Sequence, residues 1–324
     1  MKKILIMLPV PKAGFVENLP GSEFVYPAGD GFSKEELKEK VVDCDVIVTV
    51  YGNKLDNEVI DAAPGLKMIA NYGAGYDNVD VAYASSKNIL VTNSPDPVTE
   101  PTAELAFGLM IAVARRIGEM NNRLRMDGGI QWGVMRNLST TLMGKRLGII
   151  GMGAIGKAIA RRALASGMEV VYHNRKPVDK AVEAQYKAQY LSLEELLKTS
   201  DVVSLNVPLT TETKHMIGKK ELDLMKTSAY LVNTARGPVV DEAALIDALK
   251  KGNIAGAGLD VYEKEPNIPE ALFEMNNVVL MPHLGTATYE TRDEMSVVVA
   301  HNIKAAFEGR MPSNAINPDV LAHW

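Results

Sequence analysis

The chain has 324 residues, of which 47% are hydrophobic and 23% are charged, an ordinary composition for a globular protein of about two domains. A formal net charge of −5 excludes the strongly basic character of most nucleic-acid-binding proteins. A single cysteine, Cys44, excludes an intrachain disulfide, and the sequence predicts no metal site. No apolar run is long enough to span a bilayer, so we expect a cytoplasmic protein that binds neither membrane nor nucleic acid.

Short apolar runs alternate with helical patterns at the start of the chain. Strands are predicted at 4–8, 46–50, 67–70 and 89–91. Ser33 and Glu36 form a capping-box pattern that predicts the start of a helix between two of these strands. Alternation of this kind is typical of a parallel sheet with helices on both faces.

A long apolar helix is predicted next, at 100–123, followed by a polar loop at 126–141. Pro101 suits the first turn of that helix, where a backbone N–H has no intrahelical partner. A second alternating series then begins. Its strands are predicted at 146–150, 169–173, 202–207, 230–233, 257–261 and 278–281, and its helices at 154–166, 241–250 and 289–307, with a further capping box at Ser192 and Glu195.

These elements predict an α/β protein with two doubly wound parallel-sheet domains. The last helix is long enough to cross back onto the first series, so the second domain is inserted into the first. We place the first domain at residues 1–101 and 290–324, and the second at 102–289.

A glycine-rich turn indicates that the second domain binds a dinucleotide, unless its glycines serve packing alone. Gly151, Gly153 and Gly156 form a G-x-G-x-x-G pattern directly after a predicted strand, and the same residues open a predicted helix with Ala154 and Ile155. The glycines allow a tight turn, a close approach of the pyrophosphate and close helix–strand packing. The helix N-terminus then presents free N–H groups to the phosphates.

The end of the next predicted strand indicates which cofactor is preferred. NAD-selective domains usually place a carboxylate there for the ribose 2′-OH, whereas this chain has Asn174, Arg175 and Lys176. The two cations attract a 2′-phosphate. The sequence therefore favours NADP(H), with NAD(H) still usable, unless the cations are only a solvated pair in a loop.

Five segments resemble the D-isomer-specific 2-hydroxyacid dehydrogenase family. They lie at 71–80, 98–106, 232–237, 258–266 and 281–287. The resemblance implies a Rossmann cofactor domain inserted into a flavodoxin-like substrate domain. It also implies NAD(P)H-dependent reduction of a small 2-keto acid to the D-2-hydroxy acid, as in the glyoxylate/hydroxypyruvate reductase branch.

The resemblance also implies the catalytic residues. His283 is the expected general acid, since imidazole exchanges protons near neutral pH. Glu265 is expected to hydrogen-bond the other ring nitrogen of His283. Arg236 is expected to bind the substrate carboxylate and carbonyl oxygen through its planar fork, and to contact the cofactor together with His283.

Further binding residues follow from the same resemblance. The main-chain N–H groups near Tyr72 and Gly73 are expected to bind the substrate carboxylate, and Tyr51 lies near the loop that closes over the substrate side chain. The other expected cofactor contacts are Thr102, Val207, Pro208, Thr213, Thr234, Ala235 and Asp260. Asn206 departs from the histidine found in many relatives, on the adenine side of the pocket.

Other functions remain open at this point. D-lactate, 2-ketogluconate, formate or phosphite dehydrogenases share the fold and the carboxylate loop, although a formate enzyme is expected to carry glutamine in place of Glu265. A cofactor-sensing corepressor on the same fold is a different class of protein, and the intact catalytic residues count against it. A homodimer through the cofactor domain is expected, since residues 123–143 resemble the arm that joins relatives.

Overall fold

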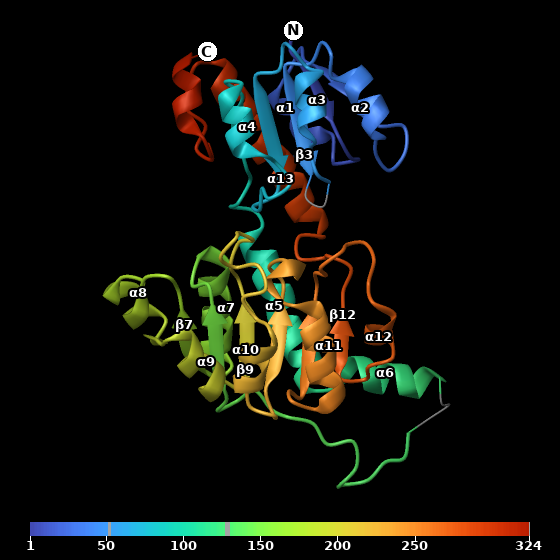
Figure 1. Cartoon of the computed structure of the whole chain (residues 1–324), viewed down its shortest axis with the longest axis vertical. Coiled ribbons are helices and arrows are strands. Elements are labelled where there is room, and N and C mark those ends of the chain that lie inside the picture. Colours follow the sequence, from blue (N-terminus) through green and yellow to red (C-terminus); the bar gives the residue numbers. More distant parts are fainter. Residues whose placement is uncertain (51–52, 127–129, 324) are drawn as a thin grey trace. The chain divides into compact units, whose positions relative to one another are not determined.

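The computed structural model describes residues 1–50, 53–126 and 130–323, and its contacts divide the chain into two compact units (Figure 1). Unit 1 is made of Met1–Val98 and Thr286–Trp324, and unit 2 is Thr99–Gly285. Each unit contains one sheet in which all neighbouring strands run parallel. The predicted fold class, α/β with two parallel sheets, is confirmed.

Unit 1 has a five-stranded sheet in the order β2-β1-β3-β4-β5. Its strands are β1 (Lys3–Ile6), β2 (Glu23–Val25), β3 (Val46–Val50), β4 (Met68–Tyr72) and β5 (Leu90–Thr92). Its helices are α1 (Ala13–Asn18), α2 (Lys34–Lys40), α3 (Asn57–Asp61), α4 (Val81–Ser86), α13 (Tyr289–Phe307) and the short η2 (Pro318–His323). Side chains of β1 alternate between two cores: Ile4 packs with α1 and α13, and Leu5 packs with α2, α3 and α4.

Unit 2 has a seven-stranded sheet in the order β12-β11-β10-β9-β6-β7-β8. Its strands are β6 (Arg146–Ile150), β7 (Glu169–His173), β8 (Ala188–Tyr190), β9 (Val202–Leu205), β10 (Tyr230–Asn233), β11 (Gly256–Leu259) and β12 (Val278–Leu280). Its helices are α5 (Thr99–Ala114), α6 (Ile117–Met126), α7 (Ala154–Ala165), α8 (Lys180–Gln185), α9 (Leu193–Thr199), α10 (Lys219–Leu224), α11 (Glu242–Lys251), α12 (Glu270–Phe273) and the short η1 (Gly237–Val239).

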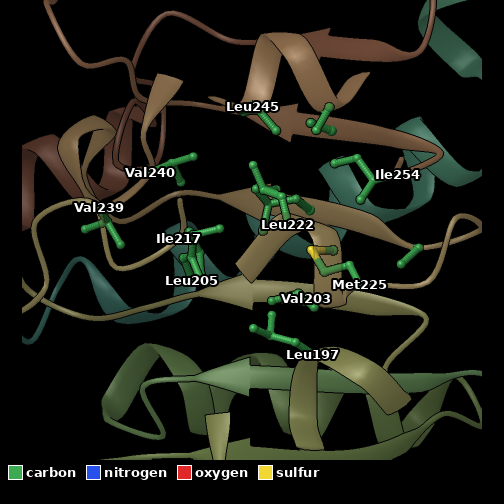
Figure 2. Close-up of a cluster of buried hydrophobic side chains, with 14 of the residues drawn as sticks. Leu197, Val203, Leu205, Ile217, Leu222, Met225, Val239, Val240, Leu245 and Ile254 are labelled. Atoms are coloured by element: carbon green, nitrogen blue, oxygen red, sulfur yellow. The ribbon is translucent and has the colours of Figure 1, made fainter. Parts of the chain in front are cut away.

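The core of unit 2 has one layer on each face of its sheet. Helices α5 and α7 cover one face, with Leu109 and Ile159 fully or almost fully buried. Helices α9, α10 and α11 cover the other, where Leu197, Leu222 and Leu245 pack against strand side chains (Figure 2). Burial on both faces explains why the strands read as continuous apolar runs rather than as alternating patterns.

The predicted single helix at 100–123 is wrong, because the structure contains two helices, α5 and α6. The chain turns at Arg116, whose φ of +56° lies in the left-handed region. The turn is held by Thr140, whose N–H donates to Ala114 O at 3.0 Å, and by Arg116 Nη1, which donates to Leu138 O at 3.0 Å. Arginine is a good helix former, so the sequence carries no local signal for this break.

Two of the four edge strands, β2 and β8, were also not predicted. Each is short and includes a polar residue, whereas the equally short edge strands β5 and β12 continue apolar runs that were predicted at 89–91 and 278–281. Among the described residues, no helix is long and apolar enough to cross a membrane. In the same part of the chain, no group of three or more His, Cys, Asp or Glu side chains is arranged to hold a metal ion.

Candidate active site

The glycine-rich turn after β6 is shaped for close contact with a ligand. Gly151 has φ +100°, and a Cβ on Gly156 would lie 2.2 Å from Gly151 O, so both positions require glycine. A Cβ on Gly153 would meet no protein atom within 4 Å and would project into open space. Ala154 and Ile155 begin α7, whose N-terminal amides follow this turn. The turn therefore leaves room for phosphate beside Gly153.

A pocket of about 750 Å³ adjoins this turn, within the size range of ligand sites. It is lined by Ile150, Gly151, Met152, Gly153, His173, Asn174, Arg175, Lys176, Asn206, Val207, Pro208, Thr210, Glu212, Thr213 and Met216. Asn206 Oδ1 is buried there with no hydrogen-bond partner among the described residues. A bound ligand would supply the missing donor, since buried polar atoms are normally paired. These features fit a nicotinamide dinucleotide.

The side chain of Asn174 is already oriented by the turn. Met152 N–H donates to Asn174 Oδ1 at 2.7 Å, which leaves the amide nitrogen of Asn174 as the group able to donate to a ligand. Arg175 and Lys176 follow it and are exposed at the pocket. All three residues predicted to select the cofactor therefore line one pocket.

Glu212 is a pocket residue that the sequence reasoning missed. It is the only carboxylate among the described residues lining this pocket. A hydrogen bond from the Thr210 hydroxyl, a hydrogen bond from its own backbone and the nearby charge of Arg175 hold the pKa of Glu212 below its usual range. Glu212 reaches the pocket only when the chain folds, because it lies 37 positions after Arg175 in the sequence.

The three predicted catalytic residues follow three neighbouring strands of unit 2. Arg236 follows β10, Glu265 follows β11 and His283 follows β12. His283 Nδ1 donates to Glu265 Oε2 at 2.7 Å, and Tyr262 N–H donates to Glu265 Oε1 at 3.0 Å. Because a carboxylate only accepts, the Nδ1 atom of His283 carries the hydrogen in this pair. Nε2 is then the ring nitrogen that can hold a transferable proton.

The environment of Glu265 favours its ionised form. Burial alone would raise the pKa of this carboxyl, but the hydrogen bond and charge of His283, the Tyr262 N–H and the charge of Arg236 together lower it. Glu265 therefore stays anionic beside the imidazole. This is the electrostatic arrangement that a general acid needs.

Asp260 builds the turn that carries His283. The φ of His283 is +56°, and its N–H donates to Asp260 O at 2.9 Å. The carboxylate of Asp260 accepts from Leu284 N–H at 2.7 Å and from Gly285 N–H at 2.9 Å. Asp260 is 1% exposed, and burial raises its pKa although these amides and the charge of His283 oppose that shift. Both of its oxygens thus bind the backbone, which shapes the loop around His283.

The segments that carry Arg236 and Glu265 pass very close to each other. A Cβ on Gly237 would lie 1.8 Å from Tyr262 O, so only glycine allows the approach. Asn233 Nδ2 donates to Arg236 O at 2.9 Å, and Arg236 Nη1 donates to Ala235 O at 2.8 Å. The positions of the guanidinium and of the carboxylate loop are therefore coupled through the backbone.

The remaining predicted cofactor residues of unit 2 have defined places. Val207, Pro208 and Thr213 line the pocket, and Thr213 Oγ1 donates to Pro208 O at 2.6 Å. Thr102 Oγ1 donates to Gly285 O at 3.3 Å, next to the His283 turn. Thr234 Oγ1 is buried without a partner among the described residues, beside Ala235 in the segment after β10. These atoms are consistent with a cofactor that continues from the glycine turn.

Unit 1 has a pocket of its own, of about 710 Å³, at the carboxyl ends of β1, β3 and β4. Tyr72 lines it, is fully buried, and donates through its hydroxyl to Arg292 O. Gly73 N–H, a predicted substrate donor, donates instead to Ser94 Oγ at 2.8 Å. Arg292 also lines this pocket and was not predicted. Tyr51 lies outside the described residues.

Comparisons with known proteins identify the family. Residues 107–285 match the family model of the D-isomer specific 2-hydroxyacid dehydrogenase, NAD binding domain. A glyoxylate reductase of Thermococcus litoralis is 50% identical over 289 residues, which cover 88% of this chain and 87% of that protein. The chain therefore belongs to the D-isomer specific 2-hydroxyacid dehydrogenase family.

Solved structures agree with this assignment. The glyoxylate reductase of Paecilomyes thermophila superposes with a TM-score of 0.87 at 36% identity, covering 97% of this chain and 98% of that one. An NADPH-dependent glyoxylate/hydroxypyruvate reductase of Sinorhizobium meliloti, in complex with NADP and malonate, gives 0.84 at 34% identity, covering 97% and 96%. The predicted family and the predicted NAD(P)-dependent oxidoreductase class are confirmed.

Proposed function

We propose that this protein reduces a small 2-keto acid to the D-2-hydroxy acid with a reduced nicotinamide cofactor. The observation that carries the proposal is the 2.7 Å pair between His283 Nδ1 and Glu265 Oε2, in the unit that also holds the glycine turn. The neighbouring strand end supplies Arg236. The names of the relatives support glyoxylate or hydroxypyruvate as the substrate.

The chemistry divides among these side chains. The cofactor supplies a hydride to the carbonyl carbon when it is bound. His283 holds a proton on Nε2 and donates it to the carbonyl oxygen. Glu265 fixes the tautomer of His283 and balances the charge of the imidazolium. Arg236 binds the carboxylate and the polarised carbonyl oxygen, for which a planar fork is better suited than an ammonium group.

We further propose that NADPH is preferred over NADH. The free amide nitrogen of Asn174, with Arg175 and Lys176, offers donors and positive charge to a 2′-phosphate in the described pocket. Glu212 acts against this preference, since its carboxylate repels the phosphate. The expected result is a preference on the order of tenfold, the effect of one charge-assisted bond. The name of the NADPH-dependent relative from Sinorhizobium meliloti supports the same choice.

We propose a homodimer formed through unit 2. Helix α6 and the chain after it expose several large apolar side chains that a monomer would leave in water. They are Ile117, Leu124, Met126, Trp132, Val134, Met135 and Leu138, with Trp132 92% and Val134 93% exposed. Sedimentation analysis of the native chain and of Trp132→Ser tests the proposal. A native chain that sediments as a monomer at micromolar concentration overturns it.

A panel of substrates tests the proposed reaction. Glyoxylate, hydroxypyruvate, pyruvate, phenylpyruvate and 2-ketogluconate are each assayed with NADH and with NADPH. We expect the highest kcat/KM for glyoxylate or hydroxypyruvate, and a higher kcat/KM with NADPH. Absence of turnover with all five acids would remove the proposed reaction, and a clear NADH preference would remove the cofactor proposal alone.

A further inference from the structure

His215 connects the cofactor pocket to the catalytic segments. It lies on the chain between β9 and α10, and its neighbours Thr213 and Met216 line the pocket. Its φ is +51°, and its N–H donates to Pro238 O at 2.8 Å, two residues beyond Arg236. Its Nε2 donates to Glu263 Oε1 at 3.0 Å. One residue therefore contacts both segments that carry the proposed catalytic groups.

Glu263 lies in the short loop that ends at Glu265. Its own N–H donates to Glu242 Oε2 at 3.2 Å, so the loop is fixed to the start of α11. The preceding residue, Tyr262, donates its N–H to Glu265 Oε1 at 3.0 Å and lies against Gly237. A displacement of Glu263 should therefore also move Glu265, two residues later, whose carboxylate binds His283.

We propose that His215 and Glu263 are positioning residues that couple the cofactor pocket to the Glu265–His283 pair. This inference rests on the proposed function of that pair. The coupling follows an unbroken series of contacts: the pocket loop holds His215, His215 bonds Glu263, and the Glu263 loop holds Glu265 against His283. A cofactor that contacts the pocket loop would thereby influence the position of the loop that holds Glu265.

The size of the effect is set by the exposure of the pair. The side chains of His215 and Glu263 are 39% and 26% exposed, so solvent screens part of their attraction. Breaking the pair should therefore change binding or turnover by about three- to tenfold, the scale of one hydrogen bond. That is much less than the loss of a group that transfers the proton.

The test is a double-mutant cycle between the two residues. His215→Asn suits the left-handed backbone and is too short to reach Glu263, while Glu263→Ala removes the acceptor. Glu263→Gln keeps an oxygen that accepts from His215 and serves as the conservative rescue variant. His301→Asn is the matched control, since it removes a histidine bond of the same 3.0 Å length, to Asn18 in unit 1. Each variant is measured for NADPH dissociation constant by fluorescence titration, for kcat and for unfolding free energy.

We expect His215→Asn and Glu263→Ala each to raise the dissociation constant and to lower kcat by about three- to tenfold, with the double variant no worse than the worse single. Glu263→Gln should stay within about twofold of the native chain, as should His301→Asn. The inference would be overturned if the effects of the two single variants were additive in both kcat and dissociation constant. It would also be overturned if the two residues were coupled only in unfolding free energy. The titration needs no keto acid, so a native chain that binds NADPH without turnover would remove the proposed reaction while still testing the coupling.

Discussion

The two sheets are both doubly wound but differ in strand order and in the turn at their switch points. In unit 1 the chain reverses its direction of strand addition at β1, and in unit 2 it does so at β6. After β6 come Gly151 and Gly153, whose backbone is open to a phosphate. After β1 come Pro9 and Pro11, which have no N–H to donate. A switch point thus gives a dinucleotide site only where the turn beside it has the required chemistry.

The helices that follow these turns also differ in how well they suit phosphate binding. Helix α7 has 12 residues and directs its N-terminal amides and dipole to the glycine turn. Helix α1 has only six residues. Unit 2 also holds the Glu265–His283 pair, at the ends of strands on the other side of its switch point. The comparison therefore supports cofactor binding, and the proposed proton transfer, in unit 2.

The largest expected effect is the loss of proton transfer. His283→Gln should lower kcat by about 10²-fold or more, the scale of general acid catalysis, because an amide cannot supply the proton. The NADPH dissociation constant should stay within about threefold, since the glycine turn and its pocket lie at other strand ends. His301→Gln, which changes an exposed histidine of unit 1, is the control. A variant with near-native turnover at neutral pH would assign the acid to another group.

The glycine turn provides the next largest effect. Gly153→Ala adds a Cβ that meets no protein atom, so the unfolding free energy should change little. The same Cβ would occupy space beside the bound pyrophosphate. Overpacking of this kind costs about 1–3 kcal/mol, so the dissociation constant should rise by about fivefold to 150-fold. Gly29→Ala in unit 1 also meets no atom and serves as the control. Unchanged cofactor affinity in Gly153→Ala would separate the turn from phosphate binding.

Some features were predictable from sequence because one local pattern determines each. The bounds of α13 match the predicted helix at 289–307, since a long helical pattern follows a capping threonine, Thr288. Both capping boxes, at Ser33 and Ser192, are present as predicted. The break at Arg116 was not predictable, because tertiary contacts to Leu138 impose it on a residue that favours helix.

The residues of the candidate site also differ in this respect: some are predictable from a local sequence pattern, and others come together only through tertiary contacts. The glycine turn can be read from six consecutive residues. The pairing of Glu265 with His283 joins residues 18 positions apart and was expected only from the family resemblance. Glu212 and His215 gave no sequence signal, because the charge interaction of Glu212 with Arg175 and the hydrogen bond of His215 to Glu263 arise from folding. The predicted roles of Tyr72 and Gly73 in substrate binding stay predictions.

Cofactor choice gives a smaller effect within the same pocket. Asn174→Asp combined with Arg175→Ala restores a carboxylate for the ribose 2′-OH and removes a cation from the 2′-phosphate. A charge-assisted bond contributes about 1.5–3 kcal/mol, so kcat/KM should shift from NADPH toward NADH by about tenfold or more. Glu212→Gln should move the ratio the other way, by about two- to threefold, since the residue is exposed and screened. A double variant that keeps the native ratio would place 2′-phosphate recognition elsewhere.

The smallest effect concerns the acid stability of unit 2. The lowered pKa of Glu265 means that its carboxylate stabilises the fold at pH values above the pKa of an unfolded glutamate, about 4.3. That stabilisation is lost as pH falls through the lower pKa of the folded state. The unfolding free energy of the native chain minus that of Glu265→Gln should therefore be largest near pH 6 and should shrink steadily below about pH 4. Urea unfolding across this range measures the difference, with Glu274→Gln, an exposed carboxylate of the same unit, as the control. A difference that grows as pH falls would mean that folding favours the protonated carboxyl, which the charges of His283 and Arg236 should prevent.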